Sequence, residues 1–491
     1  MVRLLEKLPA GVGPTSPTSR TSRTTSIATI GVGVLLVSGT AAAVALGFLH
    51  WDPIVSGFLT IVALLCMLLV RVPIGAAMGI AGVLGVYSVQ GMRGLESMLE
   101  SLPHDQAASW SLSVIPMFVL MGMLLWRSGV TSRMYETAGQ WLGWLPGGLA
   151  VTTNVAGAGL SAASGSTIGV TYALGRVAVP AMIAANYPTR LTLASVMMVG
   201  SSAQLIPPSL LLVVYSGLAN TVVGDQLVAG ILPGVLIAVV NTVVLVVWAA
   251  AAQKRSGVSF DRVQTTWRGR WMSLGQVWPV AVLIAVVVGG LYLGWFTATE
   301  AGAVGAFMSL VYLFVYQRGE APRALKQACI DTVSTVGAIF ILVIGAAVFS
   351  RAMALTGVTR AIAEWVADAG FGTMSFAFLL IVVFMVLGLF LEPMSMMLLT
   401  VPVLLPVLGA LDVDLIWFGV FIVLMGEIAN VTPPVGILLY VVHRLTRDRE
   451  VNLGREITLK DVITGAMAFV WTGITLAVLL ILFPGIVGVS G

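Results

Sequence analysis

The sequence carries very little charge, because Asp, Glu, Lys and Arg together make up only 9% of its 491 residues. A soluble domain has about a quarter of its residues charged, which solvates its surface. Hydrophobic residues reach 58%, and the mean hydropathy is +1.02. A soluble protein is therefore excluded. At roughly 20 residues per spanning helix, the chain has room for about a dozen membrane spans.

Cysteine and histidine are also scarce, with two and three residues respectively, all far apart in the chain. They cannot supply a disulfide framework or a thiolate metal site. The sequence contains no His-Glu-x-x-His motif and no Gly-rich Lys-Ser/Thr phosphate loop, so an intramembrane enzyme is disfavoured. The net charge of +4 is small and dispersed. We expect a protein that is not an enzyme, has no organic cofactor and does not bind nucleic acid.

Basic residues predict the topology. The first segment, 1–25, is rich in Ser, Thr and Pro and carries four basic residues, which is typical of a disordered cytoplasmic tail. An apolar run follows, and we interpret 26–50 as an extra transmembrane helix. Two strongly basic loops, 254–270 and 444–460, are expected on the cytoplasmic side as well. These positions predict a cytoplasmic N-terminus.

An internal repeat divides the rest of the chain. It contains two Pro-Pro pairs, Pro207-Pro208 and Pro433-Pro434. A further proline precedes each pair at the same distance, Pro180 before the first and Pro406 before the second. Apolar segments interrupted by Gly and Pro at matching places in two halves indicate an inverted-repeat secondary transporter with broken helices. We predict an all-α polytopic membrane protein whose repeats span 51–270 and 271–491.

The first Pro-Pro pair marks a candidate site. Proline lacks an amide donor, and the carbonyls it frees are tolerated in a membrane only inside the protein or beside a cavity. Gly200, Ser201 and Gln204 precede the pair, and a small, hydroxyl-rich cluster at 161–167 has the composition of a helical hairpin tip. Carbonyls and hydroxyls there could hold Na⁺, and helix N-termini could face a carboxylate. Tight helix packing is the alternative reading of the small residues.

Three acids of the second half, Glu300, Glu392 and Glu427, lie in apolar surroundings. Intramembrane acids face protein or water, and these could bind coupling ions, relay protons or cap helices. For Glu300, which follows Thr297 with the spacing of a capping box, helix capping is favoured. The roles of Glu392, Glu427 and Arg351 stay open at this point.

Several motifs occur in the order found in one transporter family. They are Ile115-Pro116-Met117-Phe118, Leu145-Pro146-Gly147-Gly148, Ser164-Gly165-Ser166, Leu205-Ile206-Pro207-Pro208-Ser209, Phe296-Thr297-Ala298-Thr299-Glu300 and Thr432-Pro433-Pro434-Val435-Gly436. From about residue 53 onward the chain resembles the large permease subunit (DctM-like) of tripartite ATP-independent periplasmic (TRAP) transporters, in the ion transporter superfamily. The resemblance implies an elevator-type transporter with two re-entrant helical hairpins in the bacterial inner membrane. It also implies Na⁺-coupled uptake of an organic acid such as a C4-dicarboxylate.

The same resemblance implies partners and site residues. The partners are a periplasmic substrate-binding protein and a small four-helix membrane subunit, which must be a separate chain because segment 1–50 is too short to encode it. Implied Na⁺ ligands are Ser164, Ser166, Gly200, Ser201, Gly426, Thr432 and Pro433, and implied substrate-binding residues are Ser166, Thr167, Gln204, Ser209 and Pro434. Ala203 and Gln204 depart from the usual pattern, so the substrate is left open. A stand-alone ion-coupled carboxylate carrier of similar fold is the alternative.

Overall fold

A computed structural model describes residues 52–70, 72–164, 167–256, 266–433 and 436–488. All regular elements in these residues are helices, and seven of them are long and apolar enough to cross a membrane. The predicted all-α membrane architecture is thus confirmed. The expected tail at 1–25 and the expected extra helix at 26–50 lie outside the described residues.

The helices of the first half are α3 (Pro53–Leu69), α4 (Ile74–Ala107), α5 (Val114–Arg127), α6 (Val130–Leu142), α7 (Gly148–Ser164), α8 (Thr167–Ala184), α9 (Thr189–Ala203), α10 (Leu210–Ala219) and α11 (Val223–Ser256). Those of the second half are α12 (Trp267–Tyr292), α13 (Ala298–Gln317), α14 (Ala321–Thr356), α15 (Val358–Asp368), α16 (Thr373–Leu387), α17 (Pro393–Ala410), α18 (Leu415–Val431), α19 (Ile437–Leu445), α20 (Arg449–Asn452) and α21 (Leu459–Leu482). If α5 and α6, which are bent by 73°, count as one span, the candidate spans number eight in the described part of the chain.

Helix boundaries repeat along the chain with the spacing of the proline pairs. Helices α8 and α17 begin at Thr167 and Pro393, and α9 and α18 begin at Thr189 and Leu415. Both separations equal the distance in sequence between the two Pro-Pro pairs. The series α7 to α10 therefore recurs as α16 to α19.

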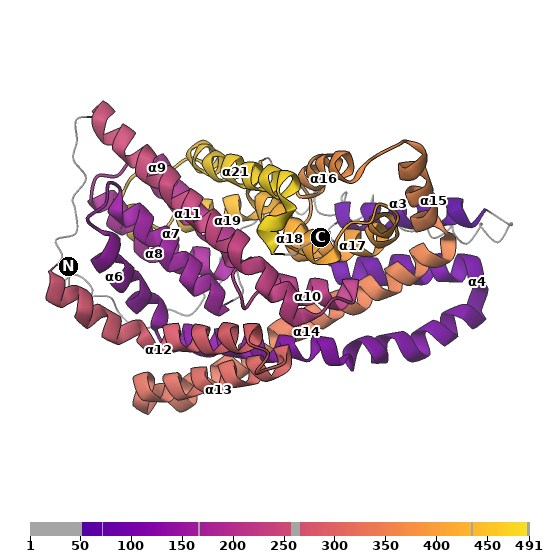
Figure 1. The fold of residues 1–491 in the computed structure, drawn as a ribbon, viewed down its shortest axis with the longest axis horizontal. Helices are drawn as coiled ribbons and strands as arrows, with labels where there is room; N and C mark the ends of the chain where they lie inside the picture. The colour runs from indigo at the N-terminus through magenta and orange to yellow at the C-terminus, as the bar shows by residue number, and fades with distance from the viewer. Residues whose placement is uncertain (1–51, 71, 165–166, 257–265, 434–435, 489–491) are drawn as a thin grey trace, which may run out of the picture.

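Helix α4 consists of two limbs. Gly91 lies between them with φ of +65° and ψ of −161°, a conformation that only glycine adopts readily. The first limb, 74–90, is mostly apolar, whereas the second limb, 91–107, is an amphipathic helix that folds back toward α14 (Figure 1).

One group of helices, here called the scaffold helices, comprises α3, α4, α5, α12, α13 and α14. The first limb of α4 packs along α14 at very short range: a Cβ built on Gly82 would lie 2.6 Å from the backbone N of Phe349. Arg127 of α5 pairs with Asp331 of α14 at 2.5 Å. Figure 1 shows α12, α13, α14 and α4 together along one long edge of the molecule.

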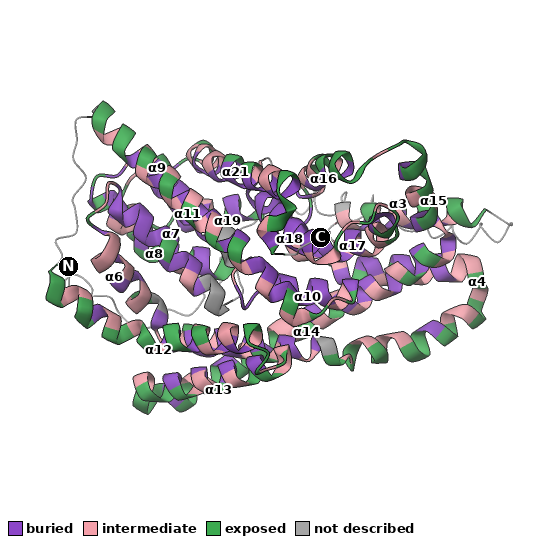
Figure 2. Ribbon diagram, viewed as in Figure 1, coloured by how far each residue is buried: buried purple, intermediate pink, exposed green. Residues whose placement is uncertain are grey.

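A second group, the core helices, comprises α7 to α11 and α16 to α21. Within it α9 packs against α7, α8 and α21, and α18 packs against α17 and α21. Buried residues gather in these helices, while α12 has few of them (Figure 2). The exposed residues include apolar rows with helical spacing, such as Val235, Val239, Val243 and Val247 of α11. Such rows are expected to face lipid.

Candidate functional site

Polar contacts stabilise the non-helical segment between α9 and α10. Gln204 caps the C-terminus of α9, and its carbonyl accepts a hydrogen bond from the hydroxyl of Ser209. The Ser209 Oγ in turn accepts from the amide of Leu212 at 3.2 Å and so caps α10. Pro207 and Pro208, joined by a cis peptide bond, lie between the two caps. Ser209 is completely buried, so its hydroxyl stabilises the helix break.

A buried hydrogen-bond chain joins the two halves of the protein. Thr167, the first residue of α8, donates its hydroxyl proton to Glu427 Oε1 of α18 at 3.0 Å. The Gln204 side-chain amide donates to the same Thr167 Oγ1 at 3.2 Å. All three side chains are buried. The chain Gln204–Thr167–Glu427, called the central network below, therefore links a helix start, a helix break and an intramembrane acid.

Gly200 allows these elements to meet. A Cβ on Gly200 would lie 2.2 Å from Thr167 Cγ2 and 3.7 Å from Glu427 Oε2. Real Cβ atoms do not approach other atoms as closely as 2.2 Å, so any side chain here would displace the Thr167 side chain or the start of α8. The glycine at this position is required by the close approach of the helices.

Glu427 has no cationic partner in the described part of the chain, where none of the ion pairs includes it. It is only 1% exposed and lies well inside α18. Burying an isolated carboxylate is expensive, and one hydroxyl donor does not offset that expense. The partial positive charge at the N-terminus of α8 also stabilises the carboxylate, but only modestly. Either a bound cation or a proton on the carboxyl group would neutralise this buried acid.

The second half presents a similar arrangement around Gly426. A Cβ on Gly426 would lie 2.9 Å from Pro393 Cβ, so the start of α17 packs directly on α18 beside Glu427. Glu392 is the N-cap residue of α17, and its Oε1 accepts a hydrogen bond from Ser395 at 3.2 Å. At the end of α18, Thr432 donates to the carbonyl of Ile428 at 2.7 Å.

Positions related by the repeat spacing compare the two arrangements directly. Gly200 corresponds to Gly426, and Gln204 corresponds to Asn430. Where the first half has Ser201 and Ser166, the second half has Glu427 and Glu392. Asn430 is buried, and its Oδ1 has no hydrogen-bond partner among the described residues. The second half thus keeps the glycine and the amide but carries acids where the first has hydroxyls.

The predicted site residues divide as follows. Thr167, Gly200 and Gln204 lie together in the central network, and Gly426 adjoins Glu427. Thr432 and Pro433 follow the end of α18. Ser164 and Ser201 fall in the last turns of α7 and α9, and their side chains lie outside the described residues, as do Ser166 and Pro434 entirely. Their ligand roles stay predictions.

The structure defines the surroundings of the intramembrane acids. Glu300 completes a capping box with Thr297, as predicted: its carboxylate accepts from the Thr297 amide at 2.8 Å. The contact of Glu427 with Thr167 was not predicted. An acid in an apolar helix was the available signal, but the sequence does not reveal which helix α18 faces at that depth.

Comparison with solved structures identifies the fold. The chain has the fold of the YdaH transporter of Alcanivorax borkumensis, with a TM-score of 0.64 and 15% identity over 88% of this chain and 98% of that one. The fold is therefore that of a multi-pass membrane transporter.

Sequence comparison then identifies the family. Residues 61–486 match the model of the tripartite ATP-independent periplasmic transporter, DctM component, and the chain belongs to this family. It is 30% identical over 378 residues to the C4-dicarboxylate TRAP transporter large permease protein DctM of Pseudomonas aeruginosa, covering 75% of this chain and 85% of that one. It is 28% identical over 422 residues to the ectoine TRAP transporter large permease protein TeaC of Halomonas elongata, covering 86% and 95%. The predicted resemblance is confirmed.

Proposed function

We propose that this permease imports an organic acid across the bacterial inner membrane and couples the uptake to Na⁺. The observation that carries the proposal is Glu427, a buried acid without a cationic partner in the described chain, at the point where both halves meet. A monovalent cation bound there compensates the carboxylate. The oxygen atoms of Thr167 and Glu427 are ligands of the hard type that Na⁺ requires.

The helix breaks supply the remaining groups of the proposed site. Carbonyls around Pro207 and around Pro433 have lost their helical amide partners, so they are available to an ion or to water. The start of α8 offers amide groups to a carboxylate substrate near Thr167. The other proposed substrate-binding residues are Ser166, Gln204, Ser209 and Pro434. The proposed ion ligands Ser164, Ser166, Gly200, Ser201, Gly426, Thr432 and Pro433 surround the same breaks.

The proposed motion is an elevator movement of the core helices against the scaffold helices. Supporting it, the proposed site is built entirely from core helices, α8, α9, α17 and α18. The segments α7–α8 and α16–α17 are proposed to be the two re-entrant hairpins, with their tips at 164–167 and 387–393. A rigid core carrying the whole site could expose it alternately to either side of the membrane.

Membership in the family implies two further proteins, a small membrane subunit and a periplasmic binding protein. The substrate is proposed only as a class, since the relatives named above are a C4-dicarboxylate and an ectoine transporter. We infer that the binding protein selects the substrate before the permease receives it.

Reconstitution into proteoliposomes tests the proposal. The permease, a candidate small subunit and a candidate binding protein would be combined, and uptake of labelled organic acids measured with and without a Na⁺ gradient. We expect uptake only from the complete mixture and only with the gradient. Uptake by the permease alone would favour the stand-alone carrier, and uptake indifferent to Na⁺ would refute the coupling.

A substitution at Thr432 tests the second helix break. Thr432→Ala removes a hydroxyl whose only described polar contacts are with Ile428 and the sulfur of Met385. We expect weaker Na⁺ activation of uptake with normal membrane insertion. Unchanged Na⁺ activation in the inserted variant would remove Thr432 from the proposed ion site.

A further inference from the structure

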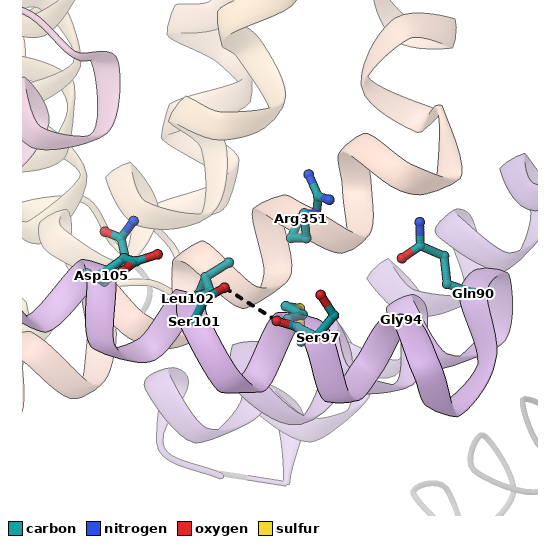
Figure 3. Close-up of a pocket in the computed structure, with 9 residues that line it drawn as sticks. Gln90, Gly94, Ser97, Ser101, Leu102, Asp105 and Arg351 are labelled. Carbon is teal, nitrogen blue, oxygen red and sulfur yellow. Dashed lines mark hydrogen bonds between the residues drawn. The ribbon is translucent and has the colours of Figure 1, made fainter.

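A pocket of about 420 Å³ lies between the second limb of α4 and the end of α14. Its polar wall consists of Gln90, Ser97, Ser101, Asp105 and Arg351 (Figure 3). None of these residues belongs to the core helices, so the pocket is separate from the central network. It is part of the scaffold.

The polar wall follows from the helical spacing of the second limb. Ser97, Ser101 and Asp105 recur at every fourth position and therefore share one face of the helix. Gln90 reaches over the same face because Gly94 has no side chain: a Cβ there would lie 2.3 Å from Gln90 Cβ. Figure 3 shows Arg351 of α14 beside this row, between Asp105 at one end and Gln90 at the other.

The sequence of α14 places the pocket at the expected depth of the lipid headgroups. Between Asp331 and Arg351, α14 carries no charged residue. At about 1.5 Å per residue this uncharged stretch spans about 28 Å, close to the ~30 Å thickness of the hydrocarbon layer. Arg323 and Lys326, before Asp331, favour the cytoplasm at that end of the helix. Arg351 is therefore expected at the outer boundary of the bilayer.

The two charges of the pocket are spatially separated. The ion pairs of the described chain include neither Arg351 nor Asp105, although both line the same pocket. A guanidinium with neighbouring hydroxyls is suited to a phosphate, and a carboxylate is suited to an ammonium group. Met98 and Leu102 of the second limb also line the pocket and give it an apolar side, where acyl chains would lie.

We propose that this pocket binds the headgroup of a zwitterionic phospholipid, phosphatidylethanolamine, with the phosphate on Arg351 and the amine on Asp105. The bound lipid joins the second limb of α4 to α14. The expected position at the bilayer boundary, the two opposite charges of Arg351 and Asp105 and the apolar residues in the pocket wall all favour a lipid over a soluble anion.

Native mass spectrometry of the purified, delipidated protein tests the proposal. Phosphatidylethanolamine and phosphatidylglycerol would each be titrated into the wild type, Arg351→Gln, Asp105→Asn and Arg93→Gln. Arg93 is the matched control, because it is an exposed arginine on the same limb that does not line the pocket. A charge-assisted hydrogen bond contributes enough that we expect Arg351→Gln to weaken phosphatidylethanolamine binding about tenfold.

The Asp105→Asn variant tests the contact with the lipid amine separately from the contact with the phosphate. Phosphatidylglycerol has no amine, so this variant should bind both lipids equally, whereas the wild type should prefer phosphatidylethanolamine. Wild-type affinity in Arg351→Gln, or an equal loss in Arg93→Gln, would overturn the site. Displacement of the lipid by succinate would show instead that the pocket takes a soluble anion.

Discussion

Replacing Thr167 by valine removes the hydroxyl at the middle of the central network while keeping the branched shape that packs against Gly200. The Gln204 amide loses an acceptor at 3.2 Å, and Glu427 loses a donor at 3.0 Å, in a place closed to water. A hydrogen bond between neutral groups contributes about 1 kcal/mol to stability, and one to a charged group about 2 kcal/mol. Together the two losses amount to about 3 kcal/mol.

This cost of about 3 kcal/mol divides between folding and ion binding. If all of it fell on binding, Na⁺ affinity would drop by about a hundredfold, because about 1.4 kcal/mol corresponds to each factor of ten. We expect half-saturating Na⁺ in proteoliposome uptake to rise at least tenfold, with the remainder seen as a lower thermal unfolding midpoint.

Thr167→Ser is the matched control for this substitution. It keeps the hydroxyl and loses one methyl group, worth about 0.8 kcal/mol, so its Na⁺ dependence should stay within about threefold of the wild type. If valine changed neither the Na⁺ dependence nor the unfolding midpoint, the central network would have no energetic role and the reasoning would fail.

Other substitutions probe the same structure. Glu427→Gln keeps an oxygen acceptor for Thr167 but removes the charge, so the half-saturating Na⁺ concentration should rise about tenfold or more. If the wild type requires Na⁺ and the variant shows the same Na⁺ titration, Glu427 is not the anion that the ion compensates. That result would leave the proposed Na⁺ coupling of uptake itself intact. Gly82→Ala places a Cβ 2.6 Å from backbone atoms of α14 and should lower the free energy of unfolding by about 1–3 kcal/mol. Gly79→Ala, whose Cβ would meet only Gly345 Cα at 3.9 Å, should leave the unfolding midpoint unchanged. Equal midpoints for the two variants would contradict the close packing of α4 on α14.

The sequence predicted the helices that are bounded by sharp changes in composition. Helix α3 is an apolar run between Asp52 and Arg71, and most of α13 is an apolar run between Glu300 and Arg318, so composition alone locates both. The second limb of α4 was missed because its charged and apolar residues are mixed, which a search for long apolar runs overlooks. Its cause, the positive φ of Gly91, is a backbone feature without a sequence signature of its own.

For the site, local chemistry was predictable and long-range pairing was not. Small and hydroxyl-bearing residues near the Pro-Pro pairs pointed to Thr167, Gly200 and Gln204. The partner of Thr167 is Glu427, which is very distant in the chain. Spacing within one helix cannot reveal such a partner, since it depends on how α18 is rotated against α8 and α9. Residue 166 and residues 434–435 lie outside the described residues, so the ligand roles of Ser166 and Pro434 are still predictions.

The correspondence of Gly200 with Gly426, and of Gln204 with Asn430, is the pattern expected of a duplication whose two copies differ in charge. With Ser201 in one half and Glu427 in the other, the helix boundaries repeat but the charges do not. A neutral copy and an anionic copy cannot hold identical cargo. Specialisation of the copies, one for a cation and one for an anion, is a route by which a symmetric duplicated protein could acquire two unlike ligands without a new fold.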